Sequence, residues 1–173
     1  MKSSNLNLNN FYGKYSSGAK SGKNKNSFFL KKNISLIEKQ IYKNCNKMGL
    51  NKNNLQNKII MNVGSGREAL ALMQFNPKKI YHYDISKDNI DRFKKIIKQK
   101  KLSNKISSEK FDLSKNTLPK KKFDFIYLHG IIQHTKDINK SITNICNSLK
   151  INGYMWFYFY RPGSFVVFLG SLQ

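Results

Sequence analysis

The sequence predicts an α/β protein built on a doubly wound, mostly parallel sheet with helices on both faces. Three observations lead to this fold class. Short apolar runs alternate along the chain with segments whose apolar residues recur at helical spacing. The helical segments are long enough to serve as crossovers between parallel strands. A pair of glycines follows the first apolar run, at the end of a strand where open sheets of this kind bind ligands.

The first half of the chain contains a helix, a strand, a second helix and a second strand, expected at 33–48, 58–63, 67–75 and 78–86. Asn33 suits the N-cap of the first helix, and Gly49 suits its end. Asn76 and Pro77 end the second helix, because proline disfavours a helical residue before it. Five apolar residues share one face of the first helix: Ile34, Ile37, Ile41, Cys45 and Met48.

The second half contains a helix, two strands, a helix and a fifth strand, expected at 87–101, 105–114, 122–130, 136–150 and 154–160. Ile90, Phe93 and Ile97 point inward from the first of these helices, and its lysines form a solvated face. The other helix aligns four apolar residues: Ile138, Ile142, Ile145 and Leu149. The fifth strand, YMWFYFY, is apolar on both faces, which is typical of a central strand.

Composition restricts the partners of the chain. The 173 residues are enough for one domain, 31–173, preceded by a flexible Asn, Lys and Ser-rich segment, 1–30. The net charge of +23 suggests non-specific attraction to polyanions. A dedicated nucleic-acid interface is not favoured, because the 29 lysines are dispersed and only 3 arginines are present to read bases and phosphates.

Two further features bear on location. Cys45 and Cys146 lie far apart without metal-ligand spacing, so the sequence indicates no metal site and a reduced, cytoplasmic environment. No signal peptide is visible. The apolar stretch 153–172 carries Arg161 and Pro162 at its centre, which favours a buried strand followed by a break over a membrane span. Oligomeric state is not predicted.

The segment NVGSGREAL, residues 62–70, carries the first ligand motif. Gly64 and Gly66 lie between the first strand and its helix, where a missing side chain lets the backbone approach a ligand. GSGREA also matches the G-x-G-x-x-A dinucleotide pattern. A tight strand-to-helix turn is the structural alternative for the same glycines.

Asp84 ends the second strand, 20 residues after Gly64. A carboxylate there can accept hydrogen bonds from both hydroxyls of a ribose. A nicotinamide dinucleotide and S-adenosylmethionine both require that contact, so Asp84 indicates a nucleoside ligand without choosing between them. Its alternative role, the N-cap of the next helix, suits Ser86 or Asp88 better.

Two further segments distinguish these cofactors. KFDLS places Asp112 after the third strand, and KFDFIYLHGIIQHTKD leads from the fourth strand into a mixed polar and apolar loop. With these segments and the later LKINGYMWFYFYRPGS, the chain resembles the class I S-adenosylmethionine-dependent methyltransferases over about residues 58–164. The resemblance is strongest to the large group in which a GVLHH-type segment follows the fourth strand and an LKPGG turn precedes the fifth.

The resemblance implies a site for S-adenosylmethionine at the carboxyl ends of the strands. Gly64 and Gly66 would border the methionine part, Asp84 would hold the ribose, and Asp112 would hold the adenine. His129 and His134 are the candidate general bases, with His134 facing the substrate pocket. The full set of implied cofactor contacts is Asn62, Gly64, Ser65, Gly66, Asp84, Ile85, Asp112, Leu113, Leu128 and His129.

The sequence departs from this family in several places. An acidic residue is usual where Asn62 stands, and a third glycine is frequent where Glu68 stands; Glu68 could supply the charge that Asn62 lacks. Gln133 and His134 replace the commoner pair of histidines. The family sheet has seven strands, and this sequence ends at Gln173, soon after the fifth, so we expect a C-terminally truncated piece of a longer enzyme.

The predicted function is therefore methyl transfer from S-adenosylmethionine to an unidentified acceptor. A small molecule is favoured over RNA, because few arginines are available to read bases. Arg161 and the aromatic residues of the N-terminal segment are candidates to touch it. Two alternatives stay open: an NAD(P)-binding oxidoreductase, which the glycine loop and Asp84 alone would allow, and a degenerate, non-catalytic cofactor-binding module.

Overall fold

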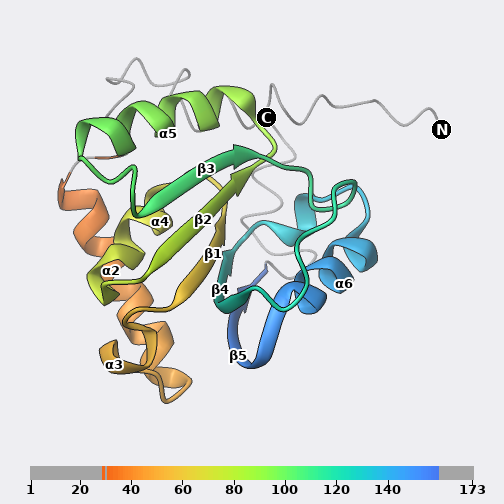
Figure 1. Ribbon diagram of the computed structural model, residues 1–173, viewed down its shortest axis with the longest axis horizontal. Coiled ribbons are helices and arrows are strands. Elements are labelled where there is room, and N and C mark those ends of the chain that lie inside the picture. Colours follow the sequence, from red (N-terminus) through yellow and green to blue (C-terminus); the bar gives the residue numbers. More distant parts are fainter. Residues whose placement is uncertain (1–28, 30, 160–173) are drawn as a thin grey trace, which may run out of the picture.

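The computed structural model describes Phe29 and residues 31–159. Five parallel strands form one sheet in the order β3-β2-β1-β4-β5 (Figure 1). The strands are β1 (Ile59–Val63), β2 (Lys79–Asp84), β3 (Ile106–Lys110), β4 (Phe123–His129) and β5 (Leu149–Tyr158). The predicted doubly wound α/β class is confirmed.

In the described part of the chain, two α-helices precede β1, and three others lie in the connections β1–β2, β2–β3 and β4–β5, with a 3₁₀ turn in the first and last of these connections. The helices are α2 (Lys31–Lys47), α3 (Lys52–Leu55), α4 (Arg67–Leu72), α5 (Lys87–Gln99) and α6 (Ile138–Ser148). The 3₁₀ turns are η2 (Met73–Phe75) and η3 (Ile132–His134). Figure 1 shows α6 on the opposite side of the sheet from α2, α4 and α5, so both faces are covered.

Each face of the sheet has its own hydrophobic core. Side chains from α2, α4 and α5 pack on one face, around Ile60, Ile80 and Phe125. Ile145 of α6 and the loop after β3 pack on the other face, around Met61 and Ile126. The predicted inward faces of α2 and α5 are confirmed, because their apolar residues lie in the first core.

Two predicted elements differ in detail. The segment predicted as a loop before β1 contains α3, which Asn51 caps by accepting from the backbone N–H groups of Asn53 and Asn54. In α6, Ile138 and Ile142 are 45% and 36% exposed, contrary to the expected face. Serines pack inward instead, because their hydroxyls are satisfied within the helix: Ser141 donates to the Asp137 carbonyl at 2.7 Å.

Strand β5 begins at Leu149, earlier than predicted, so it includes the residues that were predicted to form a turn. Its pairing with β4 shifts register between Phe123 and Phe125, which accommodates these additional residues. It forms one edge of the described sheet. Within residues 29 and 31–159, no helix combines the length and the apolar character needed to cross a bilayer.

Several predictions concern residues outside the described part, including Arg161 and most of the segment 1–30. Phe29 is the exception in that segment. Its ring is buried and stacks on Phe93 of α5 with centroids 6.0 Å apart. One of the early aromatic residues therefore belongs to the core of the domain.

Candidate functional site

The glycine loop between β1 and α4 needs glycine at both predicted positions. Gly64 has φ +129° and Gly66 has φ +89°, in a region that side chains disfavour. A Cβ on Gly66 would lie 2.6 Å from a carbon of the Phe93 ring, and one on Gly64 would lie 3.2 Å from Ile131. Backbone conformation and packing therefore explain these glycines before any ligand is considered.

A row of polar side chains crosses the sheet beneath this loop. Ser108, His82, Asn62 and Tyr127 are cross-strand neighbours on the face that α2, α4 and α5 cover. His82 contacts the Ser108 hydroxyl at 2.9 Å and the Gly64 carbonyl at 2.7 Å. Asn62 donates to the Tyr127 carbonyl at 3.1 Å, and its own Oδ1 is buried without a hydrogen-bond partner.

Asp84 lies at the carboxyl end of β2, next to the glycine loop. Its Oδ1 accepts from the backbone N–H of Ser86 at 2.6 Å, and its Oδ2 accepts from the Asn89 side chain at 3.0 Å. Burial raises the pKa of this carboxyl to about 6, although these hydrogen bonds and Arg92 act against the rise. A carboxylate oxygen can accept more than one hydrogen bond, so capacity for a ligand is left.

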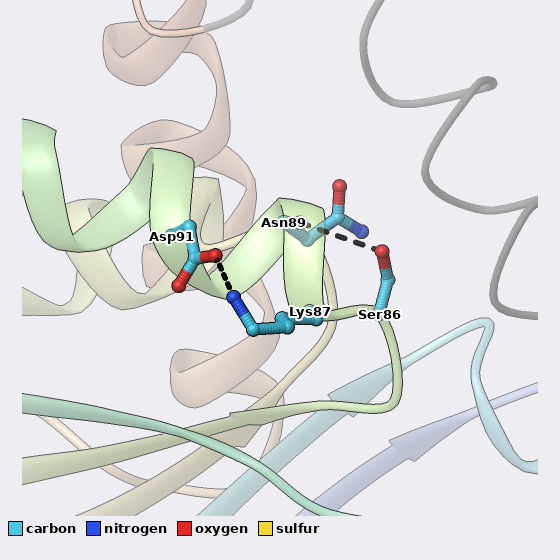
Figure 2. Close-up of polar contacts among 4 residues, drawn as sticks. All are labelled: Ser86, Lys87, Asn89 and Asp91. Carbon is cyan, nitrogen blue, oxygen red and sulfur yellow. Dashed lines mark hydrogen bonds and ion pairs between the residues drawn. The ribbon is translucent and has the colours of Figure 1, made fainter.

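Ser86 caps the helix that follows, as predicted. Figure 2 shows its hydroxyl directed at Asn89, whose backbone N–H donates to it at 3.4 Å. Ser86, and not Asp84, is therefore the N-cap residue of α5. On the same turn, Lys87 pairs with Asp91 at 2.6 Å, with side chains 73% and 51% exposed.

Asp112 follows β3, where the sequence predicts it. Its Oδ1 accepts from both the backbone N–H and the hydroxyl of Ser114, at 3.0 and 2.6 Å. These contacts order the loop after β3 and orient the carboxyl group. Leu113, the next residue, is buried in the second core, so any contact it offers a ligand comes from its backbone.

The carboxyl end of β4 carries a stack of rings. His129 is exposed and lies against Tyr158 of β5, with centroids 4.7 Å apart and planes 16° apart. The ring of Tyr127, two residues earlier on β4, is also stacked relative to His129, with centroids 6.4 Å apart. His134 lies in η3, is exposed, and has a pKa lowered by partial desolvation.

The fold brings most of the predicted residues together at the carboxyl ends of the strands. The Gly64 N–H donates to the Tyr83 carbonyl at 2.9 Å, which joins the glycine loop to the residue before Asp84. Leu128 pairs with Val63, so the end of β4 flanks the same loop. Ser65, Ile85 and Asp112 are half-buried and His129 is exposed, whereas the other predicted contact residues are buried: Asn62, Gly64, Gly66, Asp84, Leu113 and Leu128.

Sequence reasoning missed His82, Ser108 and Tyr158. A histidine inside the apolar strand KIYHYD was the available signal for the first. The pairing of His82 with Ser108 depends on strand register, and the contact of Tyr158 with His129 depends on the order of β4 and β5.

The donor set fits S-adenosylmethionine. Asp84 and Asp112 offer carboxylates for a ribose and an adenine amino group, and Asn62 offers a buried, unpaired oxygen beneath the loop. The negative charge that the family places at Asn62 is absent. Burial raises the pKa of the Tyr127 hydroxyl to about 12, and the charge of Glu68 adds to this rise. Glu68 lies in the first turn of α4. A carboxylate therefore stands near this end of the strands.

Comparisons with known proteins identify the fold and the family. The fold is that of a class I S-adenosylmethionine-dependent methyltransferase. Residues 61–157, which are 97 of the 173, match the model of the methyltransferase domain family, and the chain belongs to that family. No curated protein sequence matches the chain significantly.

Solved structures share the fold at low sequence identity. A proposed sarcosine dimethylglycine methyltransferase from Galdieria sulphuraria matches with TM-score 0.60 and 18% identity, over 68% of this chain and 44% of that chain. An S-adenosylmethionine-dependent methyltransferase from Mesorhizobium loti matches with TM-score 0.52 and 18% identity, over 62% and 48%. The [4+2]-cyclase SpnF matches with TM-score 0.60 and 17% identity, over 68% and 43%. The chain thus spans less than half of each of these proteins.

Proposed function

We propose that this chain binds S-adenosylmethionine at the carboxyl edge of β1, β2 and β4 and takes part in methyl transfer to a small-molecule acceptor. One observation carries the proposal: the buried Asp84 carboxyl ends the strand next to the Gly64–Gly66 loop, and residues 61–157 around both match the methyltransferase family. Family membership supports the cofactor, and the site geometry supports the assignment of residues.

The residues have distinct roles in this proposal. Asp84 accepts hydrogen bonds from the ribose hydroxyls, and Asp112 accepts from the adenine amino group. The glycine loop contributes backbone contacts to the methionine part. The cofactor carries a methyl group on a positively charged sulfur, from which a nucleophile can displace it. Positioning of the acceptor then provides most of the rate enhancement.

The acceptor side of the proposal rests on the end of β4. His129 and Tyr158 present an exposed stack of rings at the same edge of the sheet, which suits a small, flat or apolar acceptor. His134 has a lowered pKa and is therefore neutral at pH 7. Its imidazole can accept a proton from an acceptor hydroxyl or ammonium group.

Titration calorimetry with S-adenosylhomocysteine tests the proposal. The wild-type chain, Asp84→Asn and Asp88→Asn are titrated side by side, with NADH as the competing ligand class. Asp88 is exposed, so Asp88→Asn removes the same charge four residues away and serves as the control. We expect wild-type binding, a loss of affinity of about tenfold or more in Asp84→Asn, and no change in Asp88→Asn.

Three outcomes would contradict the proposal. Binding of NADH in place of S-adenosylhomocysteine would assign the site to an oxidoreductase. Equal losses in both variants would mean that net charge, and not the Asp84 position, governs affinity. Absence of binding by the wild-type chain, to S-adenosylhomocysteine and to NADH alike, would support a degenerate module.

A further inference from the structure

The side chain of His82 joins the cofactor loop to the interior of the sheet. It lies on β2, two residues before Asp84, and is completely buried. Its two ring nitrogens have separate partners: Nε2 lies 2.7 Å from the Gly64 carbonyl oxygen, and Nδ1 lies 2.9 Å from the Ser108 hydroxyl. The ring thus spans three neighbouring strands, from β3 through β2 to the end of β1.

The partners determine which nitrogen carries the proton. A carbonyl oxygen only accepts, so Nε2 must donate to Gly64. Burial lowers the pKa of His82 to about 4, so the ring is neutral at pH 7 and Nδ1 has no proton. Nδ1 therefore accepts from the Ser108 hydroxyl, which selects the Nε2–H form of the ring.

The same ring also supports the second glycine. Phe93 of α5 lies edge-on to His82, with centroids 4.6 Å apart, and fills the space that a Cβ on Gly66 would need. His82 thus supports Gly64 through a hydrogen bond and Gly66 through Phe93. Full burial means that His82 cannot touch a ligand itself.

We propose that His82, oriented by Ser108, is a positioning residue that holds the Gly64 carbonyl and thereby sets the conformation of the cofactor loop. The inference rests on the proposed function only in assigning that loop to the cofactor. The hydrogen bond turns the Gly64 carbonyl inward. Loss of it would leave a buried carbonyl without its partner, and the loop would open more often.

Three variants separate positioning from general stability. Ser108→Ala removes the donor to Nδ1, and Ser108→Thr keeps a hydroxyl and should restore wild-type behaviour. Ser107→Ala is the matched control, because Ser107 is the next residue on the same strand and points to the opposite face. The unfolding midpoint of each variant in urea is recorded alongside.

Two readouts do not require a ligand. The first is the tautomer of His82, read from two-bond proton–nitrogen correlations in the ¹⁵N-labelled chain; we expect Nε2–H in the wild type. The second is hydrogen exchange of the Gly64 amide, which donates to the Tyr83 carbonyl. In Ser108→Ala we expect this amide to exchange about three- to tenfold faster, with little change in Ser107→Ala and Ser108→Thr.

The third readout is affinity for S-adenosylhomocysteine. We expect Ser108→Ala to bind about three- to tenfold more weakly, and the threonine and Ser107 variants to match the wild type. A wild-type chain that binds no S-adenosylhomocysteine refutes the proposed function, while the tautomer and exchange results still test the role of His82. An Nδ1–H tautomer, or a Gly64 amide equally protected in Ser108→Ala and Ser107→Ala, would overturn the inference.

Discussion

The two halves of the site are built in opposite ways. At the ends of β1 and β2, the polar groups are buried and nearly all bonded: Asp84 is 6% exposed and both its oxygens accept hydrogen bonds. At the ends of β4 and β5, the rings are exposed: Tyr158 is 40% exposed and His129 lies open beside it. The polar groups of the first half thus have hydrogen-bond partners within the protein before any ligand binds, and the second half presents apolar surface to solvent.

The difference fits the two ligands that the proposed function requires. A cofactor that is the same in every turnover is served by a preorganised site, which lowers the ordering cost of binding. An acceptor pocket varies among enzymes that share this fold, and its walls come from loops and strand ends. Changes in the first half should therefore affect folding strongly, and changes in the second half should affect it weakly.

Gly66→Ala should have the largest effect on stability. The new Cβ would lie 2.6–2.8 Å from three carbons of Phe93, and φ at this position is +89°. Strained backbone and overpacking together predict a loss of about 2–5 kcal/mol in the free energy of unfolding, measured in urea. Gly49→Ala is the control, because Gly49 has φ +70° and nothing within 4 Å of its added Cβ, so only backbone strain applies. Equal losses in the two variants would contradict the role of Phe93 packing.

The buried carboxyl of Asp84 should give stability an unusual dependence on pH. Its pKa is raised from 3.8 to about 6 in the folded chain, so the folded state binds more protons than the unfolded state between these values. Stability contributed by this group is present below pH 3.8 and is lost as pH rises through 6. The loss is about 3 kcal/mol at pH 7.

Asp84→Asn removes that dependence. Relative to the wild type, the variant should gain stability by about 2 kcal/mol between pH 4 and pH 7, measured by urea unfolding at each pH. The pKa of His82 is lowered from 6.5 to about 4 in the folded chain, so its contribution to stability increases as pH rises. This contribution is the same in the wild type and the variant, and it cancels when their free energies of unfolding are subtracted. A difference between the variant and the wild type that does not change with pH would show that the Asp84 carboxyl is not destabilised by burial.

Only part of the buried half of the site could be predicted from the sequence. The glycines and Asp84 could be predicted because each sits at a strand end that apolar periodicity locates. His82 could not be assigned a role, since both faces of β2 are buried and a single polar residue in such a strand gives no sign of its partner. The contact of His82 with Ser108 arises from the register of β2 and β3, a pairing over 26 residues of chain.

Local patterns failed in two elements for similar reasons. The helix α3 is 4 residues long, too short for apolar periodicity to mark it, and the capping asparagine was the available signal. In α6 the four aligned apolar residues suggested the buried face, whereas Ser141 and Ser148 are fully buried. Small side chains that satisfy their hydroxyls within the helix can pack closely on a sheet, and apolar patterns do not report them.

Tyr158→Ala tests the exposed half. Removal of a half-exposed ring that stacks on His129 should reduce the free energy of unfolding by about 1 kcal/mol. Affinity for S-adenosylhomocysteine, measured by calorimetry, should stay unchanged, because the ring belongs to the acceptor side. Tyr154→Ala serves as control on the same strand and face, with Tyr154 46% exposed. A large loss of cofactor affinity in Tyr158→Ala alone would remove the division between the two halves.

Lys87→Ala should have the smallest effect, although it deletes an ion pair of 2.6 Å (Figure 2). Both side chains are mostly exposed, and a lysine in the first turn of a helix meets the unfavourable end of its dipole. We expect no measurable change in the urea midpoint at low or high salt. Ser86→Ala, one residue earlier, removes the buried cap and should cost about 1 kcal/mol. Equal losses in the two variants would show that burial does not decide how much a polar contact in this turn contributes to stability.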